Sequence, residues 1–264
     1  MIIIIDFGSQ FNQLIARRVR EHEVYCQVEP CNISISKIKK LKPQGIILSG
    51  GPSSIYEDNS PVMNPDESSG QSIFELGIPI LGICYGMHYM VHVLGGKIKE
   101  ASKKEYGYAN LDIIHQETQE TQETLFNKME TGFQCWMSHG DSVMEMPEDF
   151  MTTATTENTP IAAIANHKKN FYGLQFHPEV EHSINGKEMI GHFLFDVCRC
   201  KENWTMKSFC DSTVSMIRDT VEGKKVIMGL SGGVDSSVAA TLIHKAIGKN
   251  LFCIFVDNGL LRKD

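Results

Sequence analysis

Residues 78–94 read IPILGICYGMHYMVHVL, an apolar run that meets a glycine-bracketed cysteine and continues as a helical pattern. Ile78–Ile83 has the length and composition of a buried strand, and Met87–Leu94 repeats apolar residues at helical spacing. Glycines stand two residues before and two residues after Cys84, and they permit a tight turn that thrusts the cysteine side chain outward. The stretch therefore predicts one strand–turn–helix unit of an α/β sheet.

The same pattern recurs along the chain. Ile2–Ile5 leads through a glycine-containing turn to a helical pattern at Gln13–Glu23, and Gly45–Leu48 leads to another glycine turn. Buried strands that alternate with helices predict a parallel α/β sheet with ligand sites at the carboxyl ends of its strands. Ala162–Ala165 and Tyr172–Phe176 are closely spaced strand patterns, so the sheet is expected to be mixed.

A second α/β unit begins near the end of the chain. A polar helical connector leads to a strand at Val226–Leu230, a loop at Ser231–Ser237, a helix at Val238–Ile247 and a strand at Leu251–Val256. One such βαβ unit cannot bury a core of its own, so the chain is expected to end inside its second domain. The expected division is domain 1–198, connector 199–225 and partial domain 226–264.

Composition points to a globular protein rather than to a disordered or membrane protein. The 264 residues are 42% hydrophobic and 22% charged, enough for one full domain and part of a second. The net charge of −7 argues against a nucleic-acid partner, and no apolar stretch approaches the ~18 residues that span a membrane.

Eight irregularly spaced cysteines without a secretory signal indicate reduced thiols in the cytosol. Cys198 and Cys200 are too few ligands for a zinc site, and no metal is expected in this domain. The tract Gln116–Thr124 repeats Gln-Glu-Thr without apolar periodicity, and an exposed loop insertion is expected there.

Three motifs carry the chemistry of the first domain. The helix that follows Cys84 favours a thiolate at its N-terminus, although a structural cysteine beside an ordinary turn fits that stretch equally well. His177 and Glu179 flank a proline, so the carboxylate can orient an imidazole that accepts the thiol proton. The glycine turn at Gly51 exposes backbone N–H groups that can form an oxyanion hole with the N–H of Tyr85.

Together these motifs resemble those of the class I glutamine amidotransferases, in the same chain order. Further stretches are similar to the GMP synthetases within that family: Asp6–Gln10, Ala16–Arg20, Gly82–Met87, Glu105–Gly107, Trp136–Asp141 and Gly173–Val180. The resemblance implies a flavodoxin-like, mostly parallel sheet with helices on both faces. It implies a catalytic triad of Cys84, His177 and Glu179, with Gly51 and Tyr85 as oxyanion donors.

The resemblance also implies residues that hold the glutamine substrate. They are Ser138, His139, Gly140 and Asp141, which alternatively face a partner domain, together with His88. The family usually has glutamine at the position of His88, where it grips the amino-acid end of the substrate. Histidine differs in reach and charge, so replacing His88 by glutamine is expected to lower the KM for glutamine if the departure weakens binding.

The loop Ser231-Gly232-Gly233-Val234-Asp235-Ser236-Ser237 carries a second site. Its small residues expose N–H groups at a helix N-terminus, Ser236 and Ser237 add hydroxyl groups, and Asp235 can cap the helix or approach Mg²⁺. An ordinary turn is the alternative. The loop and the stretch Val256–Arg262 resemble the N-type ATP pyrophosphatases, whose fold is adenine nucleotide hydrolase-like, and this implies that the loop binds the pyrophosphate portion of ATP.

For the complete family the resemblance implies glutamine hydrolysis coupled to ATP- and Mg²⁺-dependent amination of XMP, a step of purine biosynthesis that yields GMP, AMP and pyrophosphate. The resemblance implies that the glutaminase step itself needs no cofactor. The chain ends at Asp264. The XMP site and the domain of the family's homodimer are therefore expected to lie outside these residues, which are expected to show slow, uncoupled glutaminase activity at most.

Two other functions stay open from the sequence. One is a catalytically incomplete remnant or binding module, which a chain supplying the missing half would rescue. The other is a different cysteine hydrolase of the same fold, such as a peptidase, which the glutamine-type motifs and the pyrophosphate loop disfavour.

Overall fold

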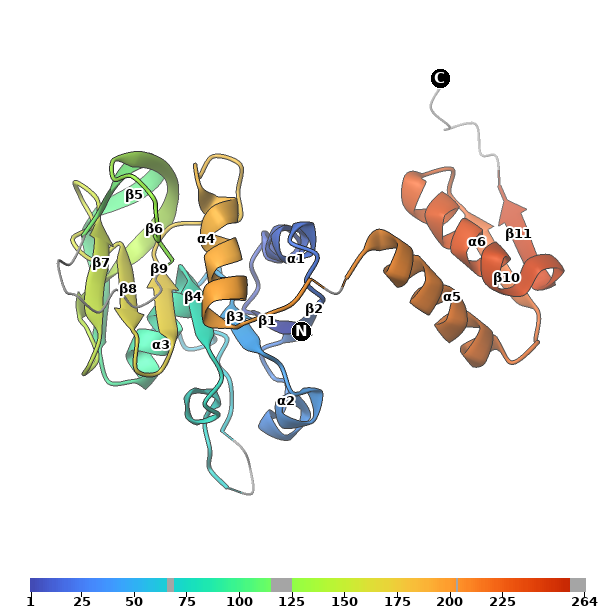
Figure 1. The fold of residues 1–264 in the computed structure, drawn as a ribbon, viewed down its shortest axis with the longest axis horizontal. Helices are drawn as coiled ribbons and strands as arrows, with labels where there is room; N and C mark the ends of the chain where they lie inside the picture. The colour runs from blue at the N-terminus through green and yellow to red at the C-terminus, as the bar shows by residue number, and fades with distance from the viewer. Residues whose placement is uncertain (66–68, 115–124, 203, 257–264) are drawn as a thin grey trace. The chain divides into compact units, whose positions relative to one another are not determined.

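The computed structural model describes residues 1–65, 69–114, 125–202 and 204–256, which form two compact units, Met1–Asn203 and Trp204–Asp264 (Figure 1). The tract Gln116–Thr124 lies outside the described residues. The elements of the first unit are β1 (Ile2–Asp6), α1 (Asn12–Glu21), β2 (Cys26–Pro30), α2 (Ile35–Leu41), β3 (Gly45–Leu48), η1 (Ile73–Glu75), β4 (Ile80–Ile83), α3 (Tyr85–Val93), β5 (Lys97–Ile113), β6 (Phe133–Glu145), β7 (Met151–Thr155), β8 (Ala163–Asn166), β9 (Phe171–Leu174), α4 (Gly186–His192) and η2 (Phe193–Val197).

The described strands of the first unit form one mixed sheet in the order β2-β1-β3-β4-β9-β8-β7-β5-β6. The strands β2, β1, β3, β4 and β9 run parallel, whereas β8, β7, β5 and β6 pair antiparallel in succession. The predicted strands and the predicted mixed sheet are therefore confirmed. Parallel strands point their carboxyl ends toward one edge, so the loops that follow β1, β3, β4 and β9 meet there.

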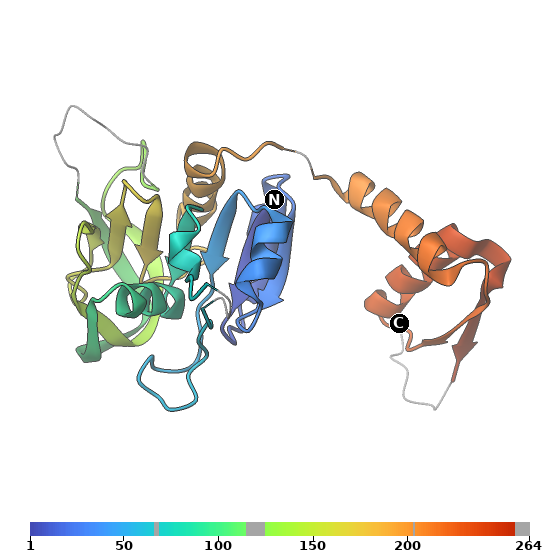
Figure 2. The ribbon, with the colours of Figure 1, turned by 90° about the horizontal axis from the view of Figure 1, so that it is seen from below.

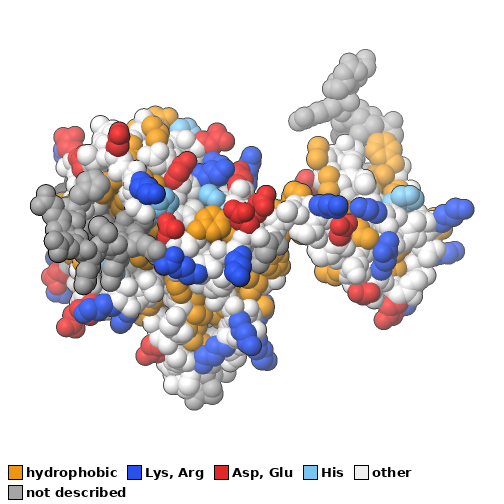
Figure 3. Space-filling view, viewed as in Figure 1, with side chains coloured by type: hydrophobic (Ala, Val, Ile, Leu, Met, Phe, Trp, Pro, Cys, Tyr) orange, Lys and Arg blue, Asp and Glu red, His pale blue; other side chains and the backbone are white. Residues whose placement is uncertain are grey.

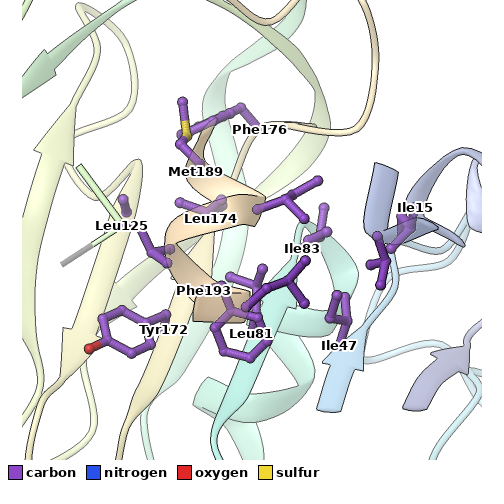
Figure 4. Packing of buried hydrophobic residues seen from close by; sticks show 14 of the residues in the cluster. Ile15, Ile47, Leu81, Ile83, Leu125, Tyr172, Leu174, Phe176, Met189 and Phe193 are labelled. Carbon is purple, nitrogen blue, oxygen red and sulfur yellow. The ribbon is translucent and has the colours of Figure 1, made fainter. Parts of the chain in front are cut away.

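Helices cover both faces of the sheet, as Figures 1 and 2 show for α4 on one side and α3 on the other. The run of four isoleucines in β1 is buried on both faces, with alternate residues pointing to opposite sides. Ile2 and Ile4 pack with residues of α1 and α4, including Phe193 just beyond α4, and Figure 4 shows part of this cluster. Ile3 and Ile5 pack with residues of α2 and α3. The predicted α/β fold class is confirmed.

The long antiparallel hairpin of β5 and β6 was not predicted from the sequence. Its register places Glu105 opposite His139 and Tyr106 opposite Ser138, with an irregularity between Glu100 and Glu105. Polar residues are frequent in both strands, so neither shows the continuous apolar run that marked the parallel strands. The hairpin brings the Ser138 segment of β6 to the carboxyl end of β4, where Cys84 lies.

The second unit contains α5 (Met206–Val221), β10 (Val226–Leu230), α6 (Val234–Ile247), the short η3 (Gly248–Asn250) and β11 (Leu251–Phe255), with β10 and β11 parallel. The expected connector 199–225 differs from this division, because α5 belongs to the second unit. The side chain of Arg218 on α5 donates to the carbonyl oxygens of Ala246 and Lys245, at 2.9 and 3.3 Å, and so ties α5 to the end of α6.

The surface charges bear on the expectation about nucleic acid, and the helices bear on the expectation about membranes. On the face of the first unit shown in Figure 3, Lys and Arg side chains are interspersed with Asp and Glu side chains. None of the helices in the described ranges combines the length and the apolar character that crossing a membrane demands.

Candidate active site

Cys84 lies at the turn between β4 and α3 in a conformation that non-glycine residues rarely adopt. Its φ is 49° and its ψ is −107°, a strained combination that costs about 1–3 kcal/mol and must be held by the surrounding structure. The backbone N–H of Cys84 donates to the carbonyl of Leu174 at 2.7 Å, which joins the turn to the end of β9. Strain of this kind concentrates at functional sites, so the geometry agrees with the predicted nucleophile turn.

The glycines on either side of Cys84 are required by close packing. A Cβ on Gly82 would lie 2.7 Å from the backbone nitrogen of Met87, within the first turn of α3. A Cβ on Gly86 would overlap the carbonyl group of Leu48 at the end of β3. The helix therefore approaches the sheet closely only because both positions lack a side chain.

The glycine turn after β3 packs directly against this nucleophile turn. A Cβ on Gly50 would lie 3.1 Å from Cε1 of His177 and 3.8 Å from Cβ of Cys84. A Cβ on Gly51 would lie 2.9 Å from the carbonyl oxygen of Phe7 and 3.1 Å from Cγ of Tyr85. Tyr85 is the first residue of α3, where N–H groups have no partner within the helix. The two residues predicted to donate to an oxyanion are thus neighbours.

His177 and Glu179 form a buried pair beside Cys84. Nδ1 of His177 donates to Oε1 of Glu179 at 2.8 Å, and the two residues are 4% and 0% exposed. Burial by itself disfavours the imidazolium, but the carboxylate of Glu179 and the hydrogen bond with Cys84 outweigh it and raise the pKa of His177 well above its usual value. Cys84, His177 and Glu179 are therefore in contact in the order that the sequence predicted for a nucleophile, a base and a carboxylate.

Three hydrogen bonds, with β6, with α1 and with the loop at Ser183, hold the turn that carries this pair. The backbone N–H of His177 donates to the carbonyl of Trp136 on β6 at 3.0 Å, and its carbonyl accepts from Oγ of Ser183 at 2.6 Å. Nε of Arg18 on α1 donates to the carbonyl of Glu179 at 3.0 Å. The orientation of the imidazole thus depends on residues far away in the sequence.

The residues predicted to hold glutamine are only partly gathered here. The carbonyl of Ser138 accepts from the thiol of Cys84 at 3.6 Å, so this part of β6 borders the nucleophile. The ring of His139 is buried, and its Nδ1 donates to the carbonyl of Asp141 at 2.9 Å while its Nε2 lies 3.6 Å from the carboxylate of Glu105. The ring therefore belongs to a buried network between β5 and β6, and glutamine binding by these residues stays a prediction.

His88 lies inside α3 and is 4% exposed, with Nε2 2.7 Å from Oε1 of Gln175. Gln175 is fully buried, and its Nε2 lies 3.9 Å from Sγ of Cys84. Sequence reasoning did not assign a role to Gln175 or to Arg18. Gln175 stands two residues before His177, just after the end of β9, and this spacing was a local signal for Gln175, whereas nothing near Arg18 in the sequence points to a residue 161 positions away.

In the second unit, the predicted loop Ser231–Ser237 is shorter than expected, because α6 begins at Val234 with Gly233 as its N-cap. The hydroxyls of Ser236 and Ser237 donate to the carbonyl of Gly233 at 3.0 and 2.9 Å and so become part of the first helical turn. The N–H of Ser237 donates to the carbonyl of Gly233 at 3.2 Å, whereas the N–H groups before it in this turn have no partner within the helix. Gly232 and Gly233 carry no side chain that could cover these groups, which suits an anion. Pyrophosphate binding here stays a prediction.

Comparison with known proteins agrees with this geometry. Residues 3–197 match the family model Glutamine amidotransferase class-I, and residues 206–257 match the family model NAD synthase. Among solved structures, a glutamine amidotransferase from Thermotoga maritima superimposes with a TM-score of 0.52 at 16% identity, covering 93% of this chain and 89% of that chain. At this identity the likeness shows the fold alone.

Two relatives similar in sequence carry the name GMP synthase [glutamine-hydrolyzing]. The protein of Brachyspira hyodysenteriae is 53% identical over 263 residues, and that of Lactobacillus acidophilus is 54% identical over 263 residues. Both alignments cover 100% of this chain and 49% of the relative. The chain thus spans about half the length of the curated relatives it matches.

Proposed function

Because this chain belongs to the class I glutamine amidotransferase family, we propose that it hydrolyses the side-chain amide of glutamine to glutamate and ammonia. The single observation that carries the proposal is the contact of Cys84 with the buried pair of His177 and Glu179. The relatives' name, which includes glutamine hydrolysis, supports it.

In this mechanism the thiolate of Cys84 attacks the amide carbon of glutamine, and the carbonyl oxygen takes up the negative charge. The backbone N–H groups of Gly51 and Tyr85 stabilise that oxyanion. The imidazolium of His177 donates its proton to the amide nitrogen, so ammonia leaves and a thioester remains on Cys84. Water, deprotonated by His177, then attacks the thioester carbon, which releases glutamate and regenerates the thiol.

Glu179 keeps the imidazole of His177 in the tautomer that these reaction steps require. Its Oε1 accepts a hydrogen bond from the N–H at Nδ1, which leaves Nε2 free to exchange a proton with sulfur and with the leaving nitrogen. Both side chains are almost fully buried, so their interaction is less screened by water than an exposed pair would be. Ser138, His139, Gly140, Asp141 and His88 are the candidates for positioning the substrate.

For the complete protein, the ammonia serves the amination of XMP to GMP at the expense of ATP. The relatives' name and the resemblance of the loop Ser231–Ser237 to ATP pyrophosphatases support this step. The exposed N-terminus of α6 fits the pyrophosphate portion of ATP, where Mg²⁺ would offset its charge. Cytosolic location and a homodimer of the complete protein belong to the same proposal.

Glutamate release by the 264-residue chain tests the glutaminase. Wild type is expected to release glutamate slowly, whereas Cys84→Ala is expected to release none above background. Cys253→Ala, which removes an exposed thiol in the second unit, is the matched control and should retain the wild-type rate. Equal rates for wild type and Cys84→Ala would refute the assignment of the nucleophile.

A further inference from the structure

Gln175 bridges a buried histidine and the nucleophile. Its Oε1 lies 2.7 Å from Nε2 of His88, and its Nε2 lies 3.9 Å from Sγ of Cys84. Gln175 is 0% exposed, His88 is 4% exposed and Cys84 is 6% exposed, so water competes little for these contacts. The three side chains form one chain of polar contacts inside the core.

The charge state of His88 decides which of its ring nitrogens carries a proton. Burial lowers the pKa of His88 to about 4, with the nearby His139 adding to this, and the hydrogen bond to Gln175 and the carboxylate of Asp141 offset only part of it. The ring is therefore neutral near pH 7. A neutral imidazole that contacts a carbonyl oxygen through Nε2 carries its proton there, because the oxygen can only accept.

A donor on Nε2 of His88 determines how the amide of Gln175 is turned. The amide oxygen faces His88, and the NH₂ group then faces the sulfur. The reverse orientation would place the amide oxygen against the sulfur of Cys84, where the carbonyl of Ser138 already lies at 3.6 Å. Two carbonyl oxygens beside a thiolate would repel its charge, whereas an N–H donor stabilises it.

We infer that His88 is a positioning residue, which holds the amide of Gln175 so that its NH₂ group donates to the sulfur of Cys84 and stabilises the thiolate before glutamine binds. The inference rests on the proposed function of Cys84 as the nucleophile. It differs from the sequence-based expectation that His88 grips the substrate, since the role described here needs no substrate contact.

Backbone hydrogen bonds keep the three residues in register. The N–H of Gln175 donates to the carbonyl of Ala162 at 2.9 Å, directly after β9. The N–H of Cys84 donates to the carbonyl of Leu174 at 2.7 Å, and the N–H of His88 donates to the carbonyl of Cys84 at 3.1 Å. The side chains are therefore attached to one connected framework, in which a change at His88 is transmitted to the sulfur through one amide group.

The test measures thiolate reactivity in the absence of glutamine. The 264-residue chain is alkylated with iodoacetamide at pH 7, and mass spectrometry follows the peptide that contains Cys84, because the chain has other free thiols. The variants are His88→Met, Gln175→Met and the double variant, with His88→Gln as a conservative rescue. His92→Met is the matched control, because His92 lies in the last turn of the same helix and contacts Tyr56 instead.

We expect His88→Met and Gln175→Met each to slow alkylation of Cys84 about tenfold, as the loss of one hydrogen bond to a charged group implies. The double variant is expected to be no slower than either single variant, because both remove the same contact. Glutamine places an amide nitrogen close to the position of Nε2, so His88→Gln is expected to retain the wild-type rate, as is His92→Met.

Three results would overturn the inference. They are an unchanged alkylation rate in a folded His88→Met variant, additive losses in the double variant, and a His88→Gln variant as slow as His88→Met. Thermal unfolding of every variant shows whether it is folded, and Gln175→Met carries the test if His88→Met is not. A raised KM for glutamine with unchanged alkylation in His88→Met would place His88 at the substrate and leave the proposed glutaminase intact. If the wild-type chain releases no glutamate but the variants alkylate as expected, the proposed function is refuted and the positioning role of His88 is not.

Discussion

Arg18→Met probes whether a side chain on the first helix holds the turn that carries His177 and Glu179 in place. Nε of Arg18 donates to the carbonyl of Glu179 at 3.0 Å, and its Nη1 donates to Oε2 of Glu21 at 2.9 Å, while the side chain is 16% exposed. Methionine keeps most of the length and the apolar stem but has no donor. The variant therefore releases the backbone of Glu179 without opening a large cavity.

The size of the effect follows from the burial of the contact. A hydrogen bond from a charged group contributes about 1.5–3 kcal/mol, and water that enters where the partly exposed Arg18 side chain stood recovers some of that. A net loss of about 1–2 kcal/mol in the transition state corresponds to a fall in kcat of about 5- to 30-fold. The KM for glutamine should change less, because the contact orients Glu179 and not the substrate.

Arg17→Met is the matched control for this prediction. Arg17 also contacts Glu21, at 3.0 Å, but its side chain is 67% exposed, so this pair is worth only about 0.3–0.5 kcal/mol. Glutamate release at saturating glutamine and urea midpoints of both variants give the comparison. Equal kcat values for Arg18→Met and Arg17→Met, both folded, would show that the contact of Arg18 with Glu179 does not hold the turn that carries His177 and Glu179.

Two further predictions concern the same site. Gly51→Ala should lower kcat about 100-fold, because a Cβ there would lie 2.9 Å from the carbonyl oxygen of Phe7 and must displace an oxyanion donor. Gly229→Ala, with open space around the added Cβ, is the control and should keep the wild-type kcat. Equal losses in both variants would contradict this prediction. Burial alone would lower the pKa of His177, but Glu179 and the contact with Cys84 raise it. The excess stability of wild type over His177→Gln should therefore be fully present below about pH 6.5. It should decline as pH rises through the folded-state pKa of His177. Urea midpoints of the two proteins over a pH series measure it, and a constant difference would refute that protonation state.

The sequence predicted those parts of the fold that depend on local patterns. Ile2–Ile5 and Gly45–Leu48 are buried on both faces of a parallel sheet, and so they read as uninterrupted apolar runs. The hairpin of β5 and β6 has no such run, and it was missed because its stability comes from pairing across the hairpin. Helix α5 was taken for a connector because its packing against α6 is not visible in its own sequence.

The sequence by itself predicted the chemistry of Cys84, His177 and Glu179, since glycine spacing and a proline-stiffened turn are local properties of the backbone. Only the tertiary structure decided how these groups act on one another. It placed Arg18 on the carbonyl of Glu179 and turned Gln175 between His88 and the sulfur. Hydrogen-bond orientation depends on atoms brought together from distant segments at distances near 3 Å, and no pattern along the chain encodes such a meeting.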